Sequence, residues 1–429
     1  MLFTDTRPNG LAVLNYSAER IWDQFDTSRS VQQVLESLPD FAPNEVGGVV
    51  RDLWRHGFLL DSLPQRPFVS SQDTLIVWLH VTNACNLRCS YCYVRKTDGA
   101  MDEDTADSAI SAIFKTAIAY RYGRIKVKYA GGEALLNFRR ILETHDKAQA
   151  LANHHAIKLE GVVLSNGIGL SKRHVDALQQ RDLRLMISLD GVDAAHDAQR
   201  VFAGGSGSSA RVRLGIETAL QHGLVPTISV TVSASNAAAL SETVEWLLDR
   251  DLPFSLNFYR ECDASSTVES VSSSEQSIID GMLNAFKVIE NNLPRRSLLN
   301  SLVDRANLSM PHFHTCAAGT DYLVIDHNGH VTNCQMRLDS PVADIYAVDL
   351  LGAIRQSPLG IGNVSVDEKE ECCSCTWKYW CAGGCPIETY RATGRYDLKS
   401  PNCHIYQTLY PAVVRLEALR LLKYSQAVA

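Results

Sequence analysis

Three cysteines stand within eight residues of the sequence, Cys85, Cys89 and Cys92, in a CxxxCxxC spacing. Thiolates bind iron, and three of them on one loop hold three irons of a four-iron cubane while leaving the fourth open to a ligand from outside the protein. The alternatives are a zinc site and chance clustering. Three ligands at this spacing suit neither a closed zinc site nor a disulfide pair. We therefore predict an iron–sulfur cluster with one open iron.

A second group of cysteines lies in the last third of the chain. Eleven of the twelve cysteines fall within residues 85–92 or 316–403, and only Cys262 stands apart. Structural disulfides are rare in a reducing compartment, so cysteines that cluster in this way indicate metal ligation. The second group comprises Cys316, Cys334, Cys372, Cys373, Cys375, Cys381, Cys385 and Cys403. The alternative for residues 372–385 is a structural zinc module.

Charge and hydropathy narrow the classes of partner. The 41 basic and 48 acidic side chains give a formal net charge of −7, and the sequence has no long basic run, so nucleic acid and anionic membrane are poor partners. The chain begins without a charged-then-apolar signal segment, and no apolar run approaches the roughly 18 residues that span a bilayer. We expect a cytoplasmic protein. Its 429 residues suffice for two or three domains.

Strand and helix patterns alternate from Leu75 to about residue 260. Helical patterns, such as the one over residues 102–122, separate six apolar runs of strand length. Six βα units predict a parallel sheet, either a partial (βα)6 barrel or a doubly wound sheet. Polar motifs follow the carboxyl ends of these strands, where parallel α/β folds place their sites. The expected strands are 75–81, 125–130, 159–164, 183–189, 225–232 and 254–259.

These motifs resemble the radical S-adenosylmethionine superfamily, and the resemblance implies the partial barrel. Tyr91 stands before the third cysteine, where that family has an aromatic residue near the adenine of the cofactor. Gly131, Gly132 and Glu133 match the family's GGE motif, with Ala134 in place of the usual proline. The resemblance implies that backbone and carboxylate groups of this motif hold the amino group of S-adenosylmethionine. A carboxylate suits an ammonium, and glycines allow close backbone approach.

Three further residues complete the expected cofactor site. By resemblance, Ser188 hydrogen-bonds the ribose, Arg200 binds the carboxylate of the cofactor, and Asn166 is a polar contact nearby. A planar guanidinium suits the second task. The implied chemistry is one-electron cleavage of the cofactor at the open iron, which releases a carbon radical able to abstract hydrogen atoms. The three cysteines of residues 85–92 are therefore the expected catalytic ligands.

The second cysteine group resembles the SPASM extension of radical enzymes that modify peptides and proteins, which carries two auxiliary iron–sulfur clusters, expected here as [4Fe-4S]. The outer cluster is assigned by resemblance to Cys372, Cys375, Cys381 and Cys403. The inner cluster is assigned to Cys316, Cys334 and Cys385. The fullest form of the family has one more cysteine soon after the position of Cys316, and this sequence lacks it. An open iron or a ligand such as His312, His314 or Asp321 is therefore expected at the inner cluster.

Two cysteines have no place in this pattern. Cys373 is expected to be a spare thiol. Cys262 follows the sixth strand, so it either faces the cavity as a hydrogen-atom donor or is a small buried apolar residue, the commoner case.

Residues 1–66 are predicted to form a separate unit, followed by domains over residues 74–292 and 300–429, with a linker over residues 61–73. The unit has two short strands, 2–6 and 11–14, and three helices, the third with an apolar stripe that includes Trp54. It resembles the PqqD-like element, a winged helix that grips the leader of a ribosomally made precursor peptide as an added strand. A DNA-binding winged helix is the alternative, but only Arg51 and Arg55 are basic on its third helix.

The resemblances together imply a radical peptide maturase that installs an oxidative crosslink in a ribosomally synthesised precursor. The crosslink is a thioether, or a carbon–carbon or carbon–oxygen bond to an aromatic side chain. An electron donor such as flavodoxin or ferredoxin is expected. The alternatives are formylglycine formation in a sulfatase, another radical modification such as epimerisation or decarboxylation, and a non-enzymatic leader-binding or iron–sulfur carrier protein.

Overall fold

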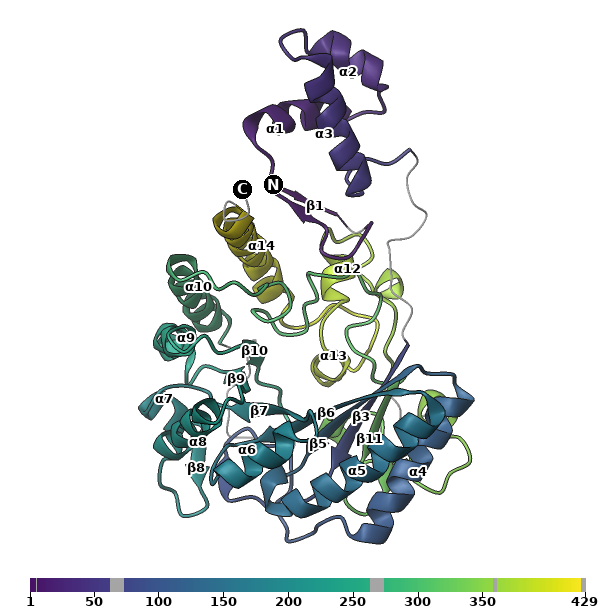
Figure 1. The fold of residues 1–429 in the computed structure, drawn as a ribbon, viewed down its shortest axis with the longest axis vertical. Helices are drawn as coiled ribbons and strands as arrows, with labels where there is room; N and C mark the ends of the chain where they lie inside the picture. The colour runs from purple at the N-terminus through teal and green to yellow at the C-terminus, as the bar shows by residue number, and fades with distance from the viewer. Residues whose placement is uncertain (5, 62–72, 263–273, 358–360, 426–429) are drawn as a thin grey trace.

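The computed structural model describes residues 1–4, 6–61, 73–262, 274–357 and 361–425. Its centre is a nine-stranded sheet with the strand order β10-β9-β7-β6-β5-β3-β11-β12-β13 (Figure 1). Most of the predicted linker, residues 62–72, lies outside the described residues.

All six predicted strands are present, and they form a parallel array. Their order in space follows their order in the chain without a reversal. A doubly wound sheet reverses at a switch point, whereas a barrel does not, so the partial (βα)6 barrel is confirmed. The strands are β3 Thr74–His80, β5 Arg124–Ala130, β6 Lys158–Ser165, β7 Arg184–Ser188, β9 Thr227–Val232 and β10 Phe254–Phe258.

Helices cover the outer face of this array because alternate strand residues are apolar on that side. In β3, Leu75, Val77 and Leu79 are fully buried in a core shared with the helices. Asp102 caps the first covering helix by accepting a hydrogen bond from the Thr105 amide at 2.8 Å. The helices are α4 Glu103–Ala119, α5 Phe138–His155, α6 Lys172–Gln179, α7 Ala194–Asp197, α8 Ser209–Gln221, α9 Leu240–Leu248 and α10 Glu275–Asn291.

The sheet continues beyond β3 into the cysteine-rich part of the chain. Strand β11, Tyr322–Ile325, pairs in parallel with β3, and a hairpin then leads to β12, His330–Thr332. Gly329 supplies the positive φ of +84° that the turn requires. β13, Ala343–Asp344, pairs with β12 at the edge of the sheet. The segments predicted as the second and third domains thus share one sheet, and their boundary stays a prediction.

The rest of the cysteine-rich part is built from loops and short helices. These are α11 Leu350–Gln356, α12 Lys378–Cys381 and α13 Pro386–Thr393, followed by the long α14 Cys403–Ser425. Short 3-10 helices are η1 Asp23–Phe25, η2 Ala134–Asn137, η3 Ala237–Ala239, η4 Gln335–Arg337 and η5 Val366–Glu368. No helix in the described ranges has the length and apolar character needed to cross a membrane.

The N-terminal unit has the predicted elements, and Figure 1 shows its helices at the opposite end of the molecule from the sheet. The predicted stripe of the third helix is only partly buried, because Trp54 is 58% exposed. Phe3 packs on Trp380, with ring centroids 4.5 Å apart, which joins the unit to the cysteine-rich part. The elements are β1 Leu2–Phe3, β2 Leu11–Ala12, α1 Tyr16–Trp22, α2 Val31–Ser37 and α3 Pro43–Arg55.

Candidate functional site

The carboxyl ends of the parallel strands surround a cavity of about 260 Å³, the strand-end cavity. All ten residues predicted to hold the open-iron cluster and its cofactor line it. They come from the loop after β3 and from the region following each of β5, β6 and β7. The ten are Cys85, Cys89, Cys92, Tyr91, Gly131, Gly132, Glu133, Asn166, Ser188 and Arg200.

The two glycines after β5 allow the backbone to press against the start of the cysteine loop. The Gly132 amide donates to the Thr82 carbonyl at 2.7 Å, and the Glu133 amide donates to the Ala84 carbonyl at 2.8 Å. A Cβ atom on Gly132 would lie 2.4 Å from the Ala84 carbonyl oxygen, far inside van der Waals contact. Glycine at this position is therefore required for the loop to sit where it does.

A short strand pair places Arg200 directly opposite a cysteine. Strand β4, Leu87–Cys89, pairs antiparallel with β8, Arg200–Phe202, so that Cys89 and Arg200 are register partners. The Ser208 hydroxyl donates to the Arg200 carbonyl at 2.7 Å and lies 3.0 Å from Nε2 of His196. Burial lowers the pKa of His196 to about 3, so its ring is a neutral hydrogen-bonding partner at pH 7. His196 and Ser208 thus hold the backbone of Arg200 in place through its carbonyl group.

The Glu133 carboxylate is buried and held in a fixed orientation. Its Oε1 accepts hydrogen bonds from the Ser165 hydroxyl at 2.8 Å and the Leu135 amide at 2.9 Å, and its Oε2 accepts from the Asn166 amide at 2.7 Å. Burial nevertheless raises the pKa of Glu133. An ammonium group in the cavity would favour the charged carboxylate, which fits the predicted contact with the amino group of the cofactor.

Tyr91 joins two buried charges across the cavity. Its hydroxyl donates to Oδ2 of Asp190 at 2.5 Å and accepts from the Arg200 guanidinium at 2.5 Å. Arg200 also lies 3.6 Å from the Asp190 carboxylate, and its Nε is buried without a hydrogen-bond partner. Buried donors are normally paired, so this nitrogen fits the predicted contact with a carboxylate of the cofactor. The hydroxyl bridge itself was not predicted from the sequence.

Several lining residues escaped the motif search. Thr231 and Asn257 lie in β9 and β10, where the rule about strand ends could have found them. No sequence pattern marked Lys96 as a residue of the site, although its Nζ lies 2.7 Å from the Cys92 sulfur. The remaining unpredicted lining residues are Trp78, Tyr93, Val94, Ala130, Leu164, Ser165, Phe258, Tyr259, Arg260, Gln335 and Met336.

The donor set of the strand-end cavity, three thiols, fits an iron–sulfur cluster, in which each cysteine binds a different iron. A site for a single metal ion, in contrast, needs all of its ligand atoms arranged around one point. Within the described ranges, no three His, Cys, Asp or Glu side chains are arranged as ligands of one metal ion.

The four cysteines assigned to the outer cluster share another cavity, of about 490 Å³, at the start of α14. Trp377 and Tyr410 also line it, and Cys373 is exposed outside it. The structure thus brings together four thiols that are spread over residues 372–403, while the thiol predicted to be spare stands apart.

The three cysteines assigned to the inner cluster pack together in a separate apolar group beneath β11. Among the suggested fourth ligands, Asp321 is engaged elsewhere, because it accepts hydrogen bonds from the Tyr122 hydroxyl and, at 3.0 Å, from Arg355. His312 has one ring nitrogen 3.2 Å from the Met310 carbonyl oxygen, while its Nε2 is buried without a partner. Burial lowers the pKa of His314.

A buried lysine stands between the two cysteine sets. Lys369 is 1% exposed, and its Nζ donates to the Ala382 carbonyl at 3.3 Å. It forms no ion pair with a carboxylate of the described chain. Burial lowers its pKa, and the interactions that oppose this lowering come from four cysteines of both sets, Cys372, Cys381, Cys385 and Cys316. A buried ammonium is costly unless negative charge lies nearby, so this position fits two anionic clusters on either side.

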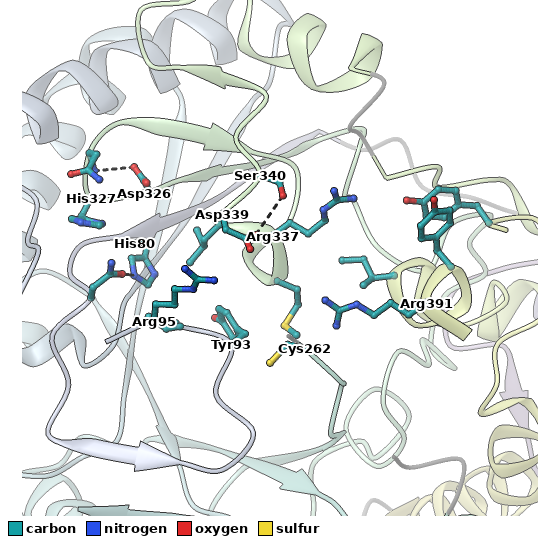
Figure 2. A pocket seen from close by; sticks show the side chains of 18 residues that line it. His80, Tyr93, Arg95, Cys262, Asp326, His327, Arg337, Asp339, Ser340 and Arg391 are labelled. Atoms are coloured by element: carbon teal, nitrogen blue, oxygen red, sulfur yellow. Dashed lines mark hydrogen bonds between the residues drawn. The ribbon is translucent and has the colours of Figure 1, made fainter. Parts of the chain in front are cut away.

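A third cavity, of about 480 Å³, adjoins the strand-end cavity (Figure 2). The two share Tyr93, Val94 and Met336 as wall residues. Cys262 lines this cavity beside Tyr93 and is not among the lining residues of the strand-end cavity. We call it the arginine cavity, after Arg95, Arg337 and Arg391 in its lining.

The comparison with known sequences matches the middle of the chain. The model of the radical SAM superfamily matches residues 79–247. The sporulation killing factor maturation protein SkfB of Bacillus subtilis strain 168 is 26% identical over 234 residues, which cover 54% of this chain and 52% of SkfB. The chain spans about half the length of the curated relatives that it matches.

Two solved structures share the fold. One is anSMEcpe with bound AdoMet and the Cp18Cys peptide, which has a TM-score of 0.64 and 18% identity over 83% of this chain and 100% of that chain. The other is SuiB of Streptococcus suis bound to its precursor peptide SuiA, with a TM-score of 0.53 and 15% identity over 91% and 92% of the two chains. At such identities the likeness concerns the fold alone.

The matched range includes all ten predicted residues of the strand-end cavity. Residues 79–247 contain the three clustered cysteines, the GGE sequence and the polar strand ends that meet there. The fold around them is the partial barrel that the sequence predicted. Residues 79–247 are therefore a radical SAM domain, and the members of that superfamily are enzymes.

Proposed function

We propose that the chain matures a ribosomally synthesised precursor peptide by installing an oxidative crosslink. The observation that carries the proposal is the convergence of all ten predicted residues on the strand-end cavity. S-adenosylmethionine bound at a [4Fe-4S] cluster supplies a carbon radical that abstracts hydrogen from unactivated positions. In this chain, Cys85, Cys89 and Cys92 would hold the cluster, and Glu133 and Arg200 would orient the two charged ends of the cofactor.

A peptide as substrate is supported by the space beside that cavity and by the relatives. The arginine cavity shares a wall with the strand-end cavity, and its volume lies in the range typical of ligand sites. SkfB is a maturation protein of a killing factor, and SuiB was solved with a precursor peptide. The N-terminal unit would bind the leader of such a precursor, as its resemblance to the PqqD-like element implies.

The two further cysteine sets would hold auxiliary clusters that take up the second electron of the oxidation. Formation of a crosslink removes two hydrogens from the peptide, so one electron remains to be accepted after the first hydrogen is abstracted. Lys369 would stabilise negative charge on both sets. An external carrier such as flavodoxin or ferredoxin would complete the electron path.

The experiment that tests this proposal is the intact mass of a candidate precursor, the product of a short reading frame beside the gene, after anaerobic co-expression. We expect a loss of two hydrogens with the full chain and none with a chain that lacks residues 1–62. The truncated chain is checked for cofactor cleavage, because Phe3 packs on Trp380 and its removal disturbs that contact. Fragmentation of the peptide then locates the new bond.

The outcome separates the alternatives. Loss of two hydrogens confined to one serine, without dependence on residues 1–62, would support formylglycine formation instead. A loss of carbon dioxide would indicate decarboxylation, and an unchanged mass with an altered residue configuration would indicate epimerisation. Absence of deoxyadenosine in every reaction would revive the non-enzymatic carrier.

A further inference from the structure

The charge of the arginine cavity comes from its guanidinium groups. Arg95 has no hydrogen bond or ion pair within the described chain, and Arg337 has no ion pair there. Figure 2 shows Arg95 and Arg391 on opposite sides of the cavity, with Tyr93 and Cys262 between them. Burial lowers the pKa of His80 to about 4, so this lining histidine is neutral at pH 7 and adds no positive charge.

The two acidic residues of the lining do not neutralise Arg95 or Arg337. Asp326 belongs to the β11–β12 turn, where its carboxylate accepts hydrogen bonds from the Asn328 and His330 amides, both at 2.8 Å, and lies 3.0 Å from the His330 ring. Asp339 is exposed, and the Ser340 hydroxyl lies 3.4 Å from its Oδ1. Neither carboxylate forms an ion pair with Arg95 or Arg337. The guanidinium charges of Arg95 and Arg337 in the lining therefore stay unneutralised.

Apolar walls complete the cavity. Tyr390 and Tyr396 stack with ring centroids 4.5 Å apart and 16° between their planes. Burial raises the pKa of Tyr396, and the neighbouring Arg337 guanidinium opposes that rise, which places this arginine beside the tyrosine pair. Leu338 and Ile387 line the same cavity. A peptide side chain with a short apolar stem and a carboxylate head matches both these apolar walls and the guanidinium groups of Arg95 and Arg337.

We propose that the arginine cavity binds an aspartate or glutamate side chain of the peptide, a few residues from the position that is modified. The shared wall of Tyr93, Val94 and Met336 puts this carboxylate next to the strand-end cavity, where the reaction takes place. Arg95 and Arg337 bind the carboxylate, and guanidinium groups are well suited to that task. The proposal rests on the proposed function, because it takes the substrate to be a peptide.

The test uses a library of random dodecapeptides, each of which is linked to its coding RNA. The library is selected for binding to the full chain after anaerobic reconstitution. We expect peptides bound by the wild type to be enriched in Asp or Glu at one position. The enrichment should vanish with the double variant Arg95→Gln and Arg337→Gln. It should persist with Arg173→Gln, which removes an exposed arginine of α6 outside the cavity lining.

A binding cycle then measures the contact. An enriched peptide, labelled with fluorescein, should bind the wild type about tenfold more weakly when its acid is changed to the amide, because a charge-assisted pair is lost. The same change should leave affinity for the double variant unaltered, within about twofold. Selection of no acidic position, or an acidic preference that survives in the double variant, overturns the proposal. The selection measures binding and does not depend on turnover. A peptide whose mass does not change in the crosslinking experiment can therefore be told apart from the absence of an acidic preference in the selection.

Discussion

Gly132→Ala is expected to abolish the cluster at Cys85, Cys89 and Cys92 while leaving the fold in place. The new methyl group would lie 2.4 Å from the Ala84 carbonyl oxygen and 2.6 Å from that of Asn83, both backbone atoms. Backbone cannot yield as a flexible side chain does, so the cysteine loop must move away from β5 and lose the hydrogen bonds of Gly132 and Glu133. Iron analysis should show a loss of about four irons per chain.

The control is Gly204→Ala, at a glycine with nothing within 4 Å of the added carbon and without a positive φ. It should keep the full iron content and cofactor cleavage. Circular dichroism of both variants reports whether the fold persists. Full iron and normal cleavage in Gly132→Ala would show that the loop tolerates the displacement and that close backbone approach is not what positions the cysteines.

Lys369→Met is expected to lower the midpoint potentials of the two proposed auxiliary clusters. Reduction adds negative charge to a cluster, and the buried ammonium between the cysteine sets stabilises that charge. Loss of a unit charge at an effective dielectric of about 20 corresponds to roughly 50–100 mV. Redox titration followed by electron paramagnetic resonance measures the shift, in a background where Cys85, Cys89 and Cys92 are alanines so that only auxiliary signals remain.

The matched control is Lys399→Met, beside the outer set. The Lys399 side chain is 48% exposed and pairs with Glu371, so solvent and the carboxylate screen its charge. Its removal should shift the potentials by less than about 20 mV. The cluster-free Lys369→Met chain should unfold at a denaturant concentration no lower than the wild type, because an uncompensated buried charge is gone. Unchanged potentials in Lys369→Met would contradict the role of Lys369 as the charge that stabilises the reduced clusters.

The six parallel strands and the helices between them could be predicted because their signals are local. Periodicity marks β3, β5, β6, β7, β9 and β10, and the motifs at successive strand ends mark the residues that line the strand-end cavity. Parallel strands bring their carboxyl ends to one edge, so residues from Cys85 to Arg200 could be expected to converge.

The remaining features depend on contacts between distant segments, which no local pattern encodes. The pairing of Cys89 with Arg200, the Tyr91 bridge to Asp190 and the position of Lys369 between two cysteine sets are of this kind. The continuation of the sheet from β3 into β11 is another, since the two strands are far apart in sequence. The exposure of Trp54 shows that an apolar stripe can extend beyond the core that it faces.

The measurement that tests the central claim most directly is the yield of 5′-deoxyadenosine from S-adenosylmethionine after anaerobic reconstitution and reduction. The wild type should form it, and Cys85→Ala should form none, because a cluster without one of its three ligands cannot present an open iron to the cofactor. Cys373→Ala removes an exposed thiol that belongs to no set and should leave the yield unchanged. Undiminished formation of deoxyadenosine by Cys85→Ala would contradict the account.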